Sequence, residues 1–502
     1  MSKKIEQDKC GIYNAYKSGL FGHHHSKGVI STIGLDERSY GETVTNFQNL
    51  CNRLGGRVLN MMENGSALVT PESISPELSI YMGRVFGVDT ERVTFINAEG
   101  IEGSDLPTRI LSDGKSMDVL RRWARGANNP VIHPRTETLE TLAIAKDIGA
   151  AHIHQMPYGT TRIVDGIYPS VEYLEKHTAN ELNSKVLNYQ LLKEVDQDLG
   201  TETAPEGDVA FDLDRAVEIV QSLWISGKDV IIKADLSVDG MGNVNLLRPK
   251  NKISNEVLRK DIKKELHSRG IPIGKDAGVV VTERLALIYD PSTEWFSPPL
   301  KWGIRSYPYY SCAMIIEKGG FGGSIIEDPA LNISRNNPGV PEDLIRRNKE
   351  YKSLIREGNR VGTEFVRRLW GDGYVGISDC DFGISNGADG NLRINILEFN
   401  NIRETGGTAA YQIKNRLGKN GFSIARDSVE GYNMAKPFDE IISDLSADGL
   451  ELTANRKRGK RGGVLVLGQE VKNGMGKIMT LTYGESYSQA YKIDQELVRR
   501  TK

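Results

Sequence analysis

Along residues 1–155, short apolar runs alternate with segments in which apolar residues recur at helical spacing. The short runs suit strands buried in a sheet, and the helical spacing marks one face of a helix. Predicted strands are 57–61, 67–70, 93–97, 130–133 and 151–154, and predicted helices are 39–54, 75–87 and 136–148. Because the two kinds of element alternate, we expect a mostly parallel α/β sheet in this part of the chain.

Residues 156–434 carry both signals in longer elements. Predicted helices are 182–199, 214–226, 256–269 and 342–370. Predicted strands are 229–234, 244–247, 279–281, 313–316, 374–383 and 392–399, whereas 201–208, 237–243 and 319–323 are expected to be loops or turns. The last two strands flank a turn at 386–391, so they should form a hairpin.

The last part of the chain has a pattern of its own. Strands are predicted at 464–467 and 477–482, on either side of a turn at 469–476, and a helix is predicted at 486–498. The full length of 502 residues is too great for one hydrophobic core, so two or three domains are expected.

Charge and cysteine content narrow the class of protein. Lys and Arg number 64 against 66 Asp and Glu, for a net charge of −2, which disfavours a general nucleic-acid binder. A basic cluster at 456–461 fits a solvated linker better than a binding patch. No apolar stretch approaches the roughly 18 residues of a membrane span. The four cysteines lie far apart with no CxxC spacing, which favours a reducing compartment. We therefore expect a cytoplasmic protein without a membrane partner.

Glycine is over-represented, at 53 residues, and glycine loops often bind phosphate. The GxGxxG match at 371–376 follows a helix and precedes a strand, the reverse of the dinucleotide-binding order. The segment 270–276 is one residue short of a Walker A loop and has no Ser or Thr after Lys275. The histidines at 23–25 and at 152 and 154 match no zinc spacing. We set these motifs aside.

A more useful glycine loop follows Lys233. This lysine ends the buried strand 229–234, and Gly240 and Gly242 lie in the turn that leads to the return strand. A lysine there can hold phosphate, and the glycine backbone can fold over it with free N–H groups. A plain hairpin loop is the alternative interpretation.

The strongest constellation surrounds the strand 392–399. Glu398 and Asn400 are two residues apart, so in a regular strand their side chains share one face. Asp381 lies on the preceding strand and could reach the same point across the hairpin. Two carboxylates and a carboxamide are oxygen ligands suited to Mg²⁺ with nucleotide phosphates, and Arg403 could hold a γ-phosphate or an acyl phosphate. The alternative is a solvated polar face on an edge strand, which the apolar neighbours of Glu398 disfavour.

The order along the chain of the strand that ends at Lys233, the glycine loop after it and the hairpin with Asp381 and Glu398 resembles the ATP-grasp superfamily. The resemblance covers about residues 178–410. The resemblance implies that Lys185 and Lys233 bind nucleotide phosphates. The segment Glu283, Arg284 and Leu285 looks like the hinge that contacts adenine, and Asp290 is a candidate ribose acceptor. In the same comparison, Asp381, Glu398 and Asn400 match the magnesium ligands, and Arg403 matches the phosphate-side arginine. ATP and two Mg²⁺ ions are the implied cofactors.

A closer resemblance, carried by the segment 398–408, is to the branch of ATP-grasp peptide ligases exemplified by the pheganomycin peptide ligase. It implies a Rossmann-like pre-ATP-grasp domain at 1–155, an ATP-grasp core at 156–434 and a small C-terminal α+β domain at 435–502. Two α+β subdomains of the core would clamp ATP, a nucleotide-binding lid at about 178–290 and a metal and substrate subdomain at about 291–434. Asp379 could replace Asp381 as the metal ligand, because both share one strand face.

The resemblance implies an ATP-dependent carboxylate–amine ligase that forms an amide through an acyl phosphate. Expected substrates are an amino-acid carboxylate and the amine of a second amino acid or a peptide, in natural product biosynthesis. Arg305 is a candidate for binding a substrate carboxylate, with a surface ion pair as the alternative. Acyl transfer to a carrier-protein thiol and a nucleotide-binding regulatory or pseudo-enzyme are the other hypotheses. Homodimers are common among relatives, so a homodimer is one expected state.

Overall fold

The computed structural model of the chain describes most of residues 184–501 and about half of the preceding part. The described ranges are 28–30, 59, 62, 64–70, 73–98, 106–127, 130–134, 139–152, 184–235, 242–251, 253–275, 277–297, 305–317, 320–326, 346–371, 373–374, 376–387, 389–401, 406–417, 421–431, 435–452, 462–472 and 475–501. None of the helices within these ranges combines the length and the apolar character needed to cross a membrane.

The first sheet contains five strands, and every pair in it is parallel. In spatial order they are β3 (Thr94–Asn97), β2 (Ala67–Thr70), β1 (Gly28–Ile30), β4 (Val131–Pro134) and β5 (Ala151–His152). The accompanying helices are α3 (Pro76–Phe86), α4 (Leu106–Ser112), α5 (Gly114–Gly126) and α6 (Leu139–Ile148). The predicted parallel α/β arrangement is confirmed, although β1, α4 and α5 are additional elements. The predicted helix at 39–54 and, apart from Leu59, the strand at 57–61 lie outside the described residues.

Local signals explain where α3 begins and ends. The Ser75 side chain accepts a hydrogen bond from the Leu78 N–H at 3.1 Å, and Pro76 occupies the first helical position. Such a start satisfies a backbone donor that the helix itself leaves free. Gly87 ends the helix with φ +69°, in the left-handed region that glycine adopts at little cost. The sequence therefore places this helix to within one residue.

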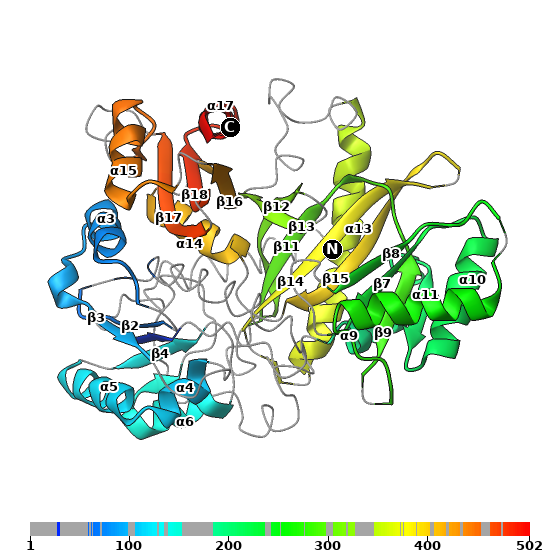
Figure 1. The fold of residues 1–502 in the computed structure, drawn as a ribbon, viewed down its shortest axis with the longest axis horizontal. Coiled ribbons are helices and arrows are strands. Elements are labelled where there is room, and N and C mark those ends of the chain that lie inside the picture. The colour runs from blue at the N-terminus through cyan, green and yellow to red at the C-terminus, as the bar shows by residue number, and fades with distance from the viewer. Residues whose placement is uncertain are drawn as a thin grey trace.

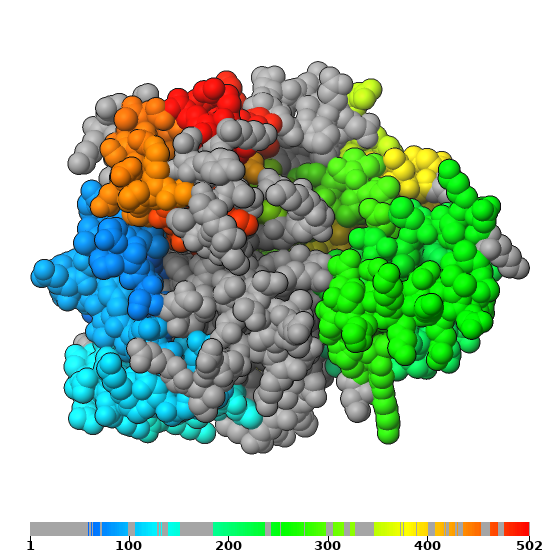
Figure 2. All heavy atoms as spheres, in the orientation of Figure 1, coloured from blue at the N-terminus to red at the C-terminus, as the bar shows by residue number. Residues whose placement is uncertain are grey.

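The second sheet has four antiparallel strands and lies at the end of the molecule opposite the first sheet, in green in Figures 1 and 2. Its spatial order is β6 (Gly207–Ala210), β9 (Val279–Glu283), β7 (Val230–Ala234) and β8 (Asn243–Leu246). Helices α10 (Leu213–Ile225) and α11 (Asn255–Ser268) share one hydrophobic core with this sheet. Helix α9 (Lys185–Leu199) packs through Val186 and Tyr189 against Val209 and Val280 of β6 and β9. Edge strand β6 replaces the end of the loop predicted at 201–208.

The third sheet has nine strands, and all of its pairs are antiparallel. Its path is β10 (Leu287–Tyr289), β14 (Gly376–Asn386), β11 (Pro291–Ser297), β12 (Tyr307–Glu317), β13 (Gly320–Ile326), β16 (Phe422–Gly431), β18 (Met475–Gly484) and β17 (Gly463–Lys472), with β15 (Leu392–Asn401) paired to β14. The hairpin predicted around 386–391 is confirmed as β14 and β15.

The turn predicted at 319–323 is wrong, because residues 320–323 belong to strand β13. The glycines in this segment serve a different purpose. A Cβ atom on Gly323 would lie 2.1 Å from the Ala425 carbonyl oxygen of the paired strand β16. Glycine here permits a close approach of two backbones, which the sequence signal for a turn does not distinguish.

Helix α13 (Asn348–Gly371) packs against β11, β14 and β15 around an aromatic core. Trp295 is fully buried there, 5.9 Å between ring centroids from Phe399, and Phe365 stacks on Phe399. The helix lies close to the sheet at Gly362, where a Cβ atom would come within 2.7 Å of the Trp295 ring. This packing supports the strands that carry the candidate site from behind.

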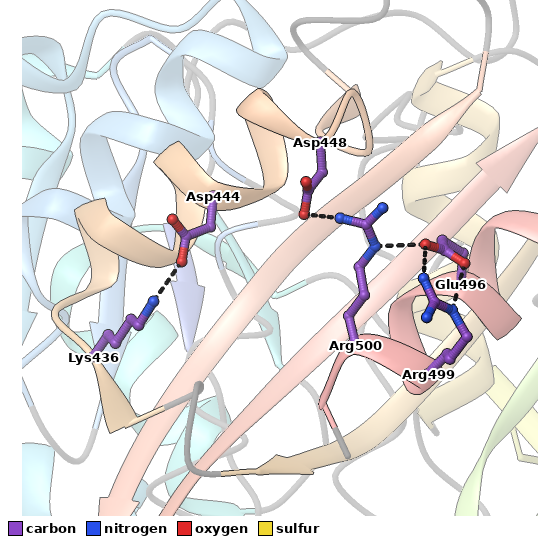
Figure 3. A network of polar contacts seen from close by, with 6 residues as sticks. All are labelled: Lys436, Asp444, Asp448, Glu496, Arg499 and Arg500. Carbon is purple, nitrogen blue, oxygen red and sulfur yellow. Dashed lines mark hydrogen bonds and ion pairs between the residues drawn. The ribbon is translucent and has the colours of Figure 1, made fainter.

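The last strands and helices are joined to the rest of the molecule by packing. A single core contains residues of α3, β12, β13, α14 (Gly406–Leu417), β16, α15 (Phe438–Ala447), β17, β18 and α17 (Tyr487–Thr501). Figure 3 shows the surface ion pairs of this region, in which Arg500 binds Asp448 beside α15 and Glu496 within α17. Figure 1 shows α3 beside α15 at the same end of the molecule.

Candidate functional site

Strand β15 carries Glu398 in an irregular stretch of its pairing with β14. Asp381 pairs with Glu398, but Phe382 pairs with Ile396, so β15 has one extra residue, Leu397, at this point. Such a bulge bends the strand and frees a backbone group from the ladder. The Leu397 carbonyl accepts a hydrogen bond from the Lys233 Nζ at 2.8 Å. The bulge therefore connects the nine-stranded sheet to β7 of the four-stranded sheet.

A second irregularity follows directly. Asp381 pairs with Glu398 and Asp379 pairs with Asn401, so two residues of β15 lie opposite Cys380. The regular alternation that predicts Glu398 and Asn400 on one face does not hold across this step. The side chain of Asn400 lies outside the described residues, and its role as a ligand stays a prediction.

Lys185 and Lys233 lie together at Glu398, although they come from α9 and β7. The Lys185 Nζ lies 2.9 Å from Glu398 Oε2, and the Lys233 Nζ lies 3.7 Å from Glu398 Oε1. Both lysines are more than nine-tenths buried. The structure thus brings together the two residues predicted to bind phosphate and one of the predicted metal ligands.

Asp235, which the sequence analysis does not single out, explains this convergence. Its Oδ1 accepts hydrogen bonds from the Ser184 Oγ at 2.6 Å and from the Val186 N–H at 3.0 Å. Its carbonyl accepts the Lys185 N–H at 3.2 Å. An anionic residue two positions after Lys233 therefore caps the first turn of α9. In the sequence, the only signals for this contact are an Asp directly after the strand that carries Lys233 and a Ser directly before helix α9. That the two side chains meet is seen only in the tertiary structure.

Burial and charge act in opposite directions on the ionisable groups of this cluster. Burial alone raises the pKa of Glu398, but the ammonium groups of Lys185 and Lys233 outweigh it and hold the pKa below its usual value. Burial lowers the pKa of Lys233, in part offset by Glu398. Burial, followed by the charges of Asp379 and Glu398, raises the pKa of Asp381 well above its usual value. Burial and the neighbouring carboxylates therefore both disfavour the ionised form of Asp381.

Asp379 and Asp381 face the same side of β14, so the two candidates for the metal ligand remain close together. On strand β11, Ser292 pairs with Asp381 and Glu294 pairs with Asp379. The Ser292 hydroxyl donates a hydrogen bond to Asp379 Oδ1. Two adjacent rungs of the sheet thus carry four carboxylates, which in order from β11 to β15 are those of Glu294, then Asp379 and Asp381, then Glu398.

Within the described ranges, no three His, Cys, Asp or Glu side chains meet closely enough to hold a metal by themselves. The predicted set differs from such a cluster, because its third member is the carboxamide of Asn400. Oxygen ligands of this kind suit Mg²⁺, and burial together with the charges of Asp379 and Glu398 raises the pKa of Asp381. The donor chemistry fits magnesium, and the ligand assignment stays a prediction.

The predicted hinge lies at the end of β9, beside β7. The Glu283 N–H donates to the Glu206 carbonyl at 2.8 Å, and the Glu283 carboxylate forms an ion pair with Lys228 at 2.9 Å. The Arg284 N–H donates to the Asp229 carbonyl at 2.7 Å. These two N–H groups therefore hold the hinge to neighbouring segments. Leu285 follows them, half-buried.

Asp290 lies between β10 and β11 with its carboxylate partly buried. Its carbonyl accepts the Met314 N–H at 2.8 Å, while its Oδ1 has no partner among the described residues. Burial raises the pKa of Asp290 from 3.8 to about 6. A buried acceptor without a donor is suited to a ligand hydroxyl, which is consistent with the ribose prediction but does not test it.

The remaining predicted residues are less defined. Gly242 begins the return to β8, and its carbonyl accepts the Ala234 N–H at 3.0 Å. Arg305 is exposed just before β12. Gly240 and Arg403 lie outside the described residues. The histidines at 23–25 and 154 lie outside them as well.

Comparison with known proteins gives information on the fold. No protein-family model matches the chain, and no curated protein matches it. One similar solved structure is the biotin carboxylase domain of the Hydrogenobacter thermophilus 2-oxoglutarate carboxylase, in complex with MgADP and bicarbonate. It is 14% identical in sequence, the match covers 96% of this chain and 91% of that chain, and the TM-score is 0.50. The Campylobacter jejuni biotin carboxylase is 11% identical, covering 96% and 92% with a TM-score of 0.49. An N5-carboxyaminoimidazole ribonucleotide synthetase with ADP is 11% identical, covering 95% and 97% with a TM-score of 0.49. The first of these carries the comparison, and it confirms the predicted fold class.

Proposed function

We propose that this chain, which has the ATP-grasp fold, is an ATP-dependent ligase that joins a carboxylate to an amine with release of ADP and phosphate. The observation that carries the proposal is the buried contact of Lys185 and Lys233 with Glu398 between two separate sheets. Two ammonium groups meeting one carboxylate, with further carboxylates on the next strand, match a site for phosphates and a cation together. The likeness in fold to a MgADP-bound carboxylase domain supports the choice of nucleotide.

The lysine contacts indicate how the site would take up a nucleotide. The Lys185 ammonium lies 2.9 Å from Glu398 Oε2. In our proposal the phosphates of ATP replace this carboxylate as the partner of Lys185 and Lys233. Glu398, Asp381 or Asp379, and Asn400 would then hold Mg²⁺. Magnesium would supply charge stabilisation for the transferring phosphoryl group.

The proposed reaction needs positioning more than a protein nucleophile. A substrate carboxylate attacks the γ-phosphorus of ATP, which gives an acyl phosphate and ADP. The amine then attacks the acyl carbon, phosphate leaves, and the amine proton is lost to solvent or to a base. We assign Arg403 to the phosphoryl oxygens and Arg305 to a substrate carboxylate. The loop with Gly240 and Gly242 would cover the phosphates and exclude water.

We propose further that Glu283, Arg284 and Leu285 contact adenine, chiefly through backbone groups, and that Asp290 binds the ribose. The substrates we propose are an amino acid as acyl donor and an amino acid or short peptide as acceptor. The resemblance of residues 398–408 to the peptide ligase branch supports this choice, and the same resemblance supports a role in natural product biosynthesis. A homodimer in solution is part of the proposal.

The first test is an ADP-release screen over pairs of amino acids and short peptides, with product mass measured for every active pair. The proposal predicts ADP release that requires both a carboxylate and an amine, with an amide as product. ADP release with a carrier-protein thiol as acceptor would indicate acyl transfer instead. Tight ATP binding without turnover for any pair would indicate a regulatory protein or pseudo-enzyme.

The site itself is tested by Lys185→Met and Glu398→Gln. Loss of the Lys185 charge should weaken ATP binding by at least about tenfold, because a charge-assisted contact with phosphate is lost. Glu398→Gln should lower kcat by at least about a hundredfold, because a metal ligand is weakened. Glu218→Gln, on the exposed surface of α10, is the matched control and should change neither value. Normal turnover in Glu398→Gln would disprove this site.

A further inference from the structure

Asp196 is a buried carboxylate near the end of α9 that the proposed reaction does not use. Only 6% of the residue is exposed. Its Oδ1 accepts hydrogen bonds from the hydroxyls of Thr201 and Thr203 at 2.6 and 2.8 Å. Its Oδ2 accepts the backbone N–H groups of Thr203 and Ala204 at 2.8 and 2.7 Å. One side chain therefore holds the segment 201–204, which follows the helix.

This segment lies where the chain passes from one sheet to the other. In the second half of α9, Leu192 and Val195 belong to the aromatic core behind the nine-stranded sheet. After the segment, β6 begins at Gly207 and pairs with β9 of the four-stranded sheet. The segment 201–204 is thus a chain connection between the two sheets that carry the candidate site.

Other side chains of α9 hold the residues that come next. The Tyr189 hydroxyl donates to the Pro205 carbonyl at 2.7 Å, and the Lys193 Nζ donates to the Gly207 carbonyl at 3.3 Å. Both contacts are further along the chain, toward β6. The position of Thr203 itself therefore depends on the carboxylate.

Thr203 in turn contacts β15 at the outer edge of the nine-stranded sheet. Its carbonyl accepts the Ile396 N–H at 2.8 Å. Among the described strands, β15 pairs with β14 alone. That pairing is irregular directly after Ile396, where Leu397 is the extra residue. Because the ladder is interrupted there, the outer contact has more weight in holding this part of the strand.

The next two residues of β15 bind the two lysines of the candidate site. The Leu397 carbonyl accepts the Lys233 Nζ at 2.8 Å, and Glu398 Oε2 lies 2.9 Å from the Lys185 Nζ. In the proposed function both lysines turn to the phosphates of ATP. The Thr203 contact, one residue earlier on β15, uses no group that we assign to the nucleotide. It can therefore persist while the lysines change partner.

We propose that Asp196 is a positioning residue, which fixes the segment 201–204 on Ile396 and so holds the four-stranded sheet where Lys233 meets Glu398. The inference rests on the proposed ATP-dependent function. Strand β6 follows the segment and is connected through β9 to β7, so the position of the segment carries over to Lys233. Without this carboxylate the two sheets would take more than one relative position, and only a fraction of the molecules would be ready to bind ATP.

The deciding variant is Asp196→Ala, which removes all four contacts. A smaller binding-competent fraction raises the apparent Kd by the inverse of that fraction, and we expect at least about a tenfold rise in Kd and KM for ATP. Calorimetric titration and steady-state kinetics measure the two values. At saturating ATP, kcat should stay within about threefold, because bound phosphates and Mg²⁺ then hold the lysines and Glu398 together.

Asp196→Asn is the rescue variant. Its amide oxygen can accept both backbone N–H groups, and its NH₂ can donate to the two hydroxyls, because a hydroxyl also accepts. The Kd for ATP should therefore stay within about threefold of the wild type. Thr203→Val removes one hydroxyl donor and should raise the Kd by about threefold, which decides the matter if Asp196→Ala does not fold. An unchanged Kd in Thr203→Val would then overturn the positioning role.

Asp113→Ala, at the start of α5 beside the first sheet, is the matched control. Asp113 also holds the backbone of its element, since it accepts hydrogen bonds from the Lys115 N–H and the Ser116 hydroxyl. Its loss should lower the melting temperature and leave the Kd for ATP unchanged. A merely structural role of Asp196 would make the two variants alike, whereas a positioning role weakens ATP binding in one of them only.

Hydrogen exchange of the ligand-free, full-length protein gives a measurement that does not depend on nucleotide. Asp196→Ala should increase exchange of the Thr203, Ala204 and Ile396 amides by at least about fivefold, with no change in α5. Unchanged exchange at these amides would overturn the contact as an anchor.

The outcomes separate this inference from the proposed function. A normal Kd for ATP in Asp196→Ala, beside an active wild type, would overturn the positioning role and leave the ligase function intact. Weaker ATP binding in Asp196→Ala, beside a wild type that binds ATP and forms no amide with any substrate pair, would support the positioning role and disprove the ligase chemistry.

Discussion

At the scale of single residues, the candidate site depends on buried charged side chains that neutralise one another, chiefly Lys185 and Lys233 against Glu398. Lys185 and Lys233 lower the pKa of Glu398, but the neighbouring Asp381 has its pKa raised by burial and by other carboxylates. Removal of one member leaves its partner buried without a counter-charge, which costs far more than a surface ion pair contributes. The site is therefore sensitive to every member of this set.

Asp290 makes a testable pH prediction at the same scale. Its pKa of about 6 in the folded protein lies above the ordinary value of 3.8. The unfolded chain binds fewer protons than the folded chain between about pH 4 and 6, so this residue lowers stability as pH rises through that window. Asp290→Asn should therefore be more stable than the wild type at about pH 8, by about 1 kcal/mol after allowance for partial exposure, and should melt at a higher temperature there. At about pH 4 the two proteins should melt at nearly the same temperature.

The measurement is thermal unfolding of the ligand-free protein at several pH values. Asp389→Asn is the control, because the Asn391 side chain holds the pKa of this exposed carboxyl below its usual value. The control should show no gain at about pH 8. An Asp290→Asn gain that is independent of pH would contradict the ionisation argument.

At the scale of elements, irregular pairing and close packing decide where the site lies. The bulge at Leu397 directs a backbone carbonyl to Lys233, and Asp235 holds the start of α9 beside the end of β7. Behind these strands, α13 lies against the sheet at Gly358 and Gly362, one turn apart. Neither residue would be noted as functional from sequence, but both determine how closely the helix supports β11 and β15.

We predict that Gly362→Val destabilises the protein by about 2 kcal/mol, since the new side chain would meet the buried Trp295 ring at 2.7 Å or less. Trp295 is fully buried beside Phe382 and Phe399, so a shift of its ring would disturb these neighbours. Urea unfolding at equilibrium measures this difference. Gly371→Val, at the end of the same helix, is the control, as its Cβ would meet nothing within 4 Å. Equal stability of the two variants would contradict the packing argument.

At the scale of the whole molecule, the last part of the chain continues the central sheet. Strand β16 pairs with β18, and β18 pairs with β17, while α17 packs on the same strands. The Arg426 guanidinium binds Asp494 on α17 through two hydrogen bonds of 2.8 and 2.7 Å, and the pair is almost completely buried. Figure 3 shows the further ion pairs of α17 and α15 at the surface.

Removal of residues 462–502 should therefore unfold more than a terminal domain. The truncated chain would expose the edge of β16 and the apolar residues of the shared core, which favours aggregation. We expect loss of soluble monomer or dimer in size-exclusion chromatography and loss of the wild-type melting transition in calorimetry. A truncated chain that melts within about 3 °C of the wild type would show that this region folds independently.

The sequence by itself determined the fold class, most strands and helices of the first two sheets, and the identity of Lys185, Lys233, Asp381 and Glu398 as a candidate group. The predicted elements and the roles considered for Lys233, Asp381 and Glu398 follow from hydrophobic periodicity, helix caps and the chemistry of the side chains, all of which are local. The ATP-grasp fold class and the choice of Lys185 come from the resemblance to that superfamily. Only the tertiary structure decided which residues meet. The pairing of β11 beside β14 places Glu294 next to Asp379, and a strand of polar appearance becomes fully buried. Register, bulges and burial depend on partners far away in the chain, so no local pattern contains them.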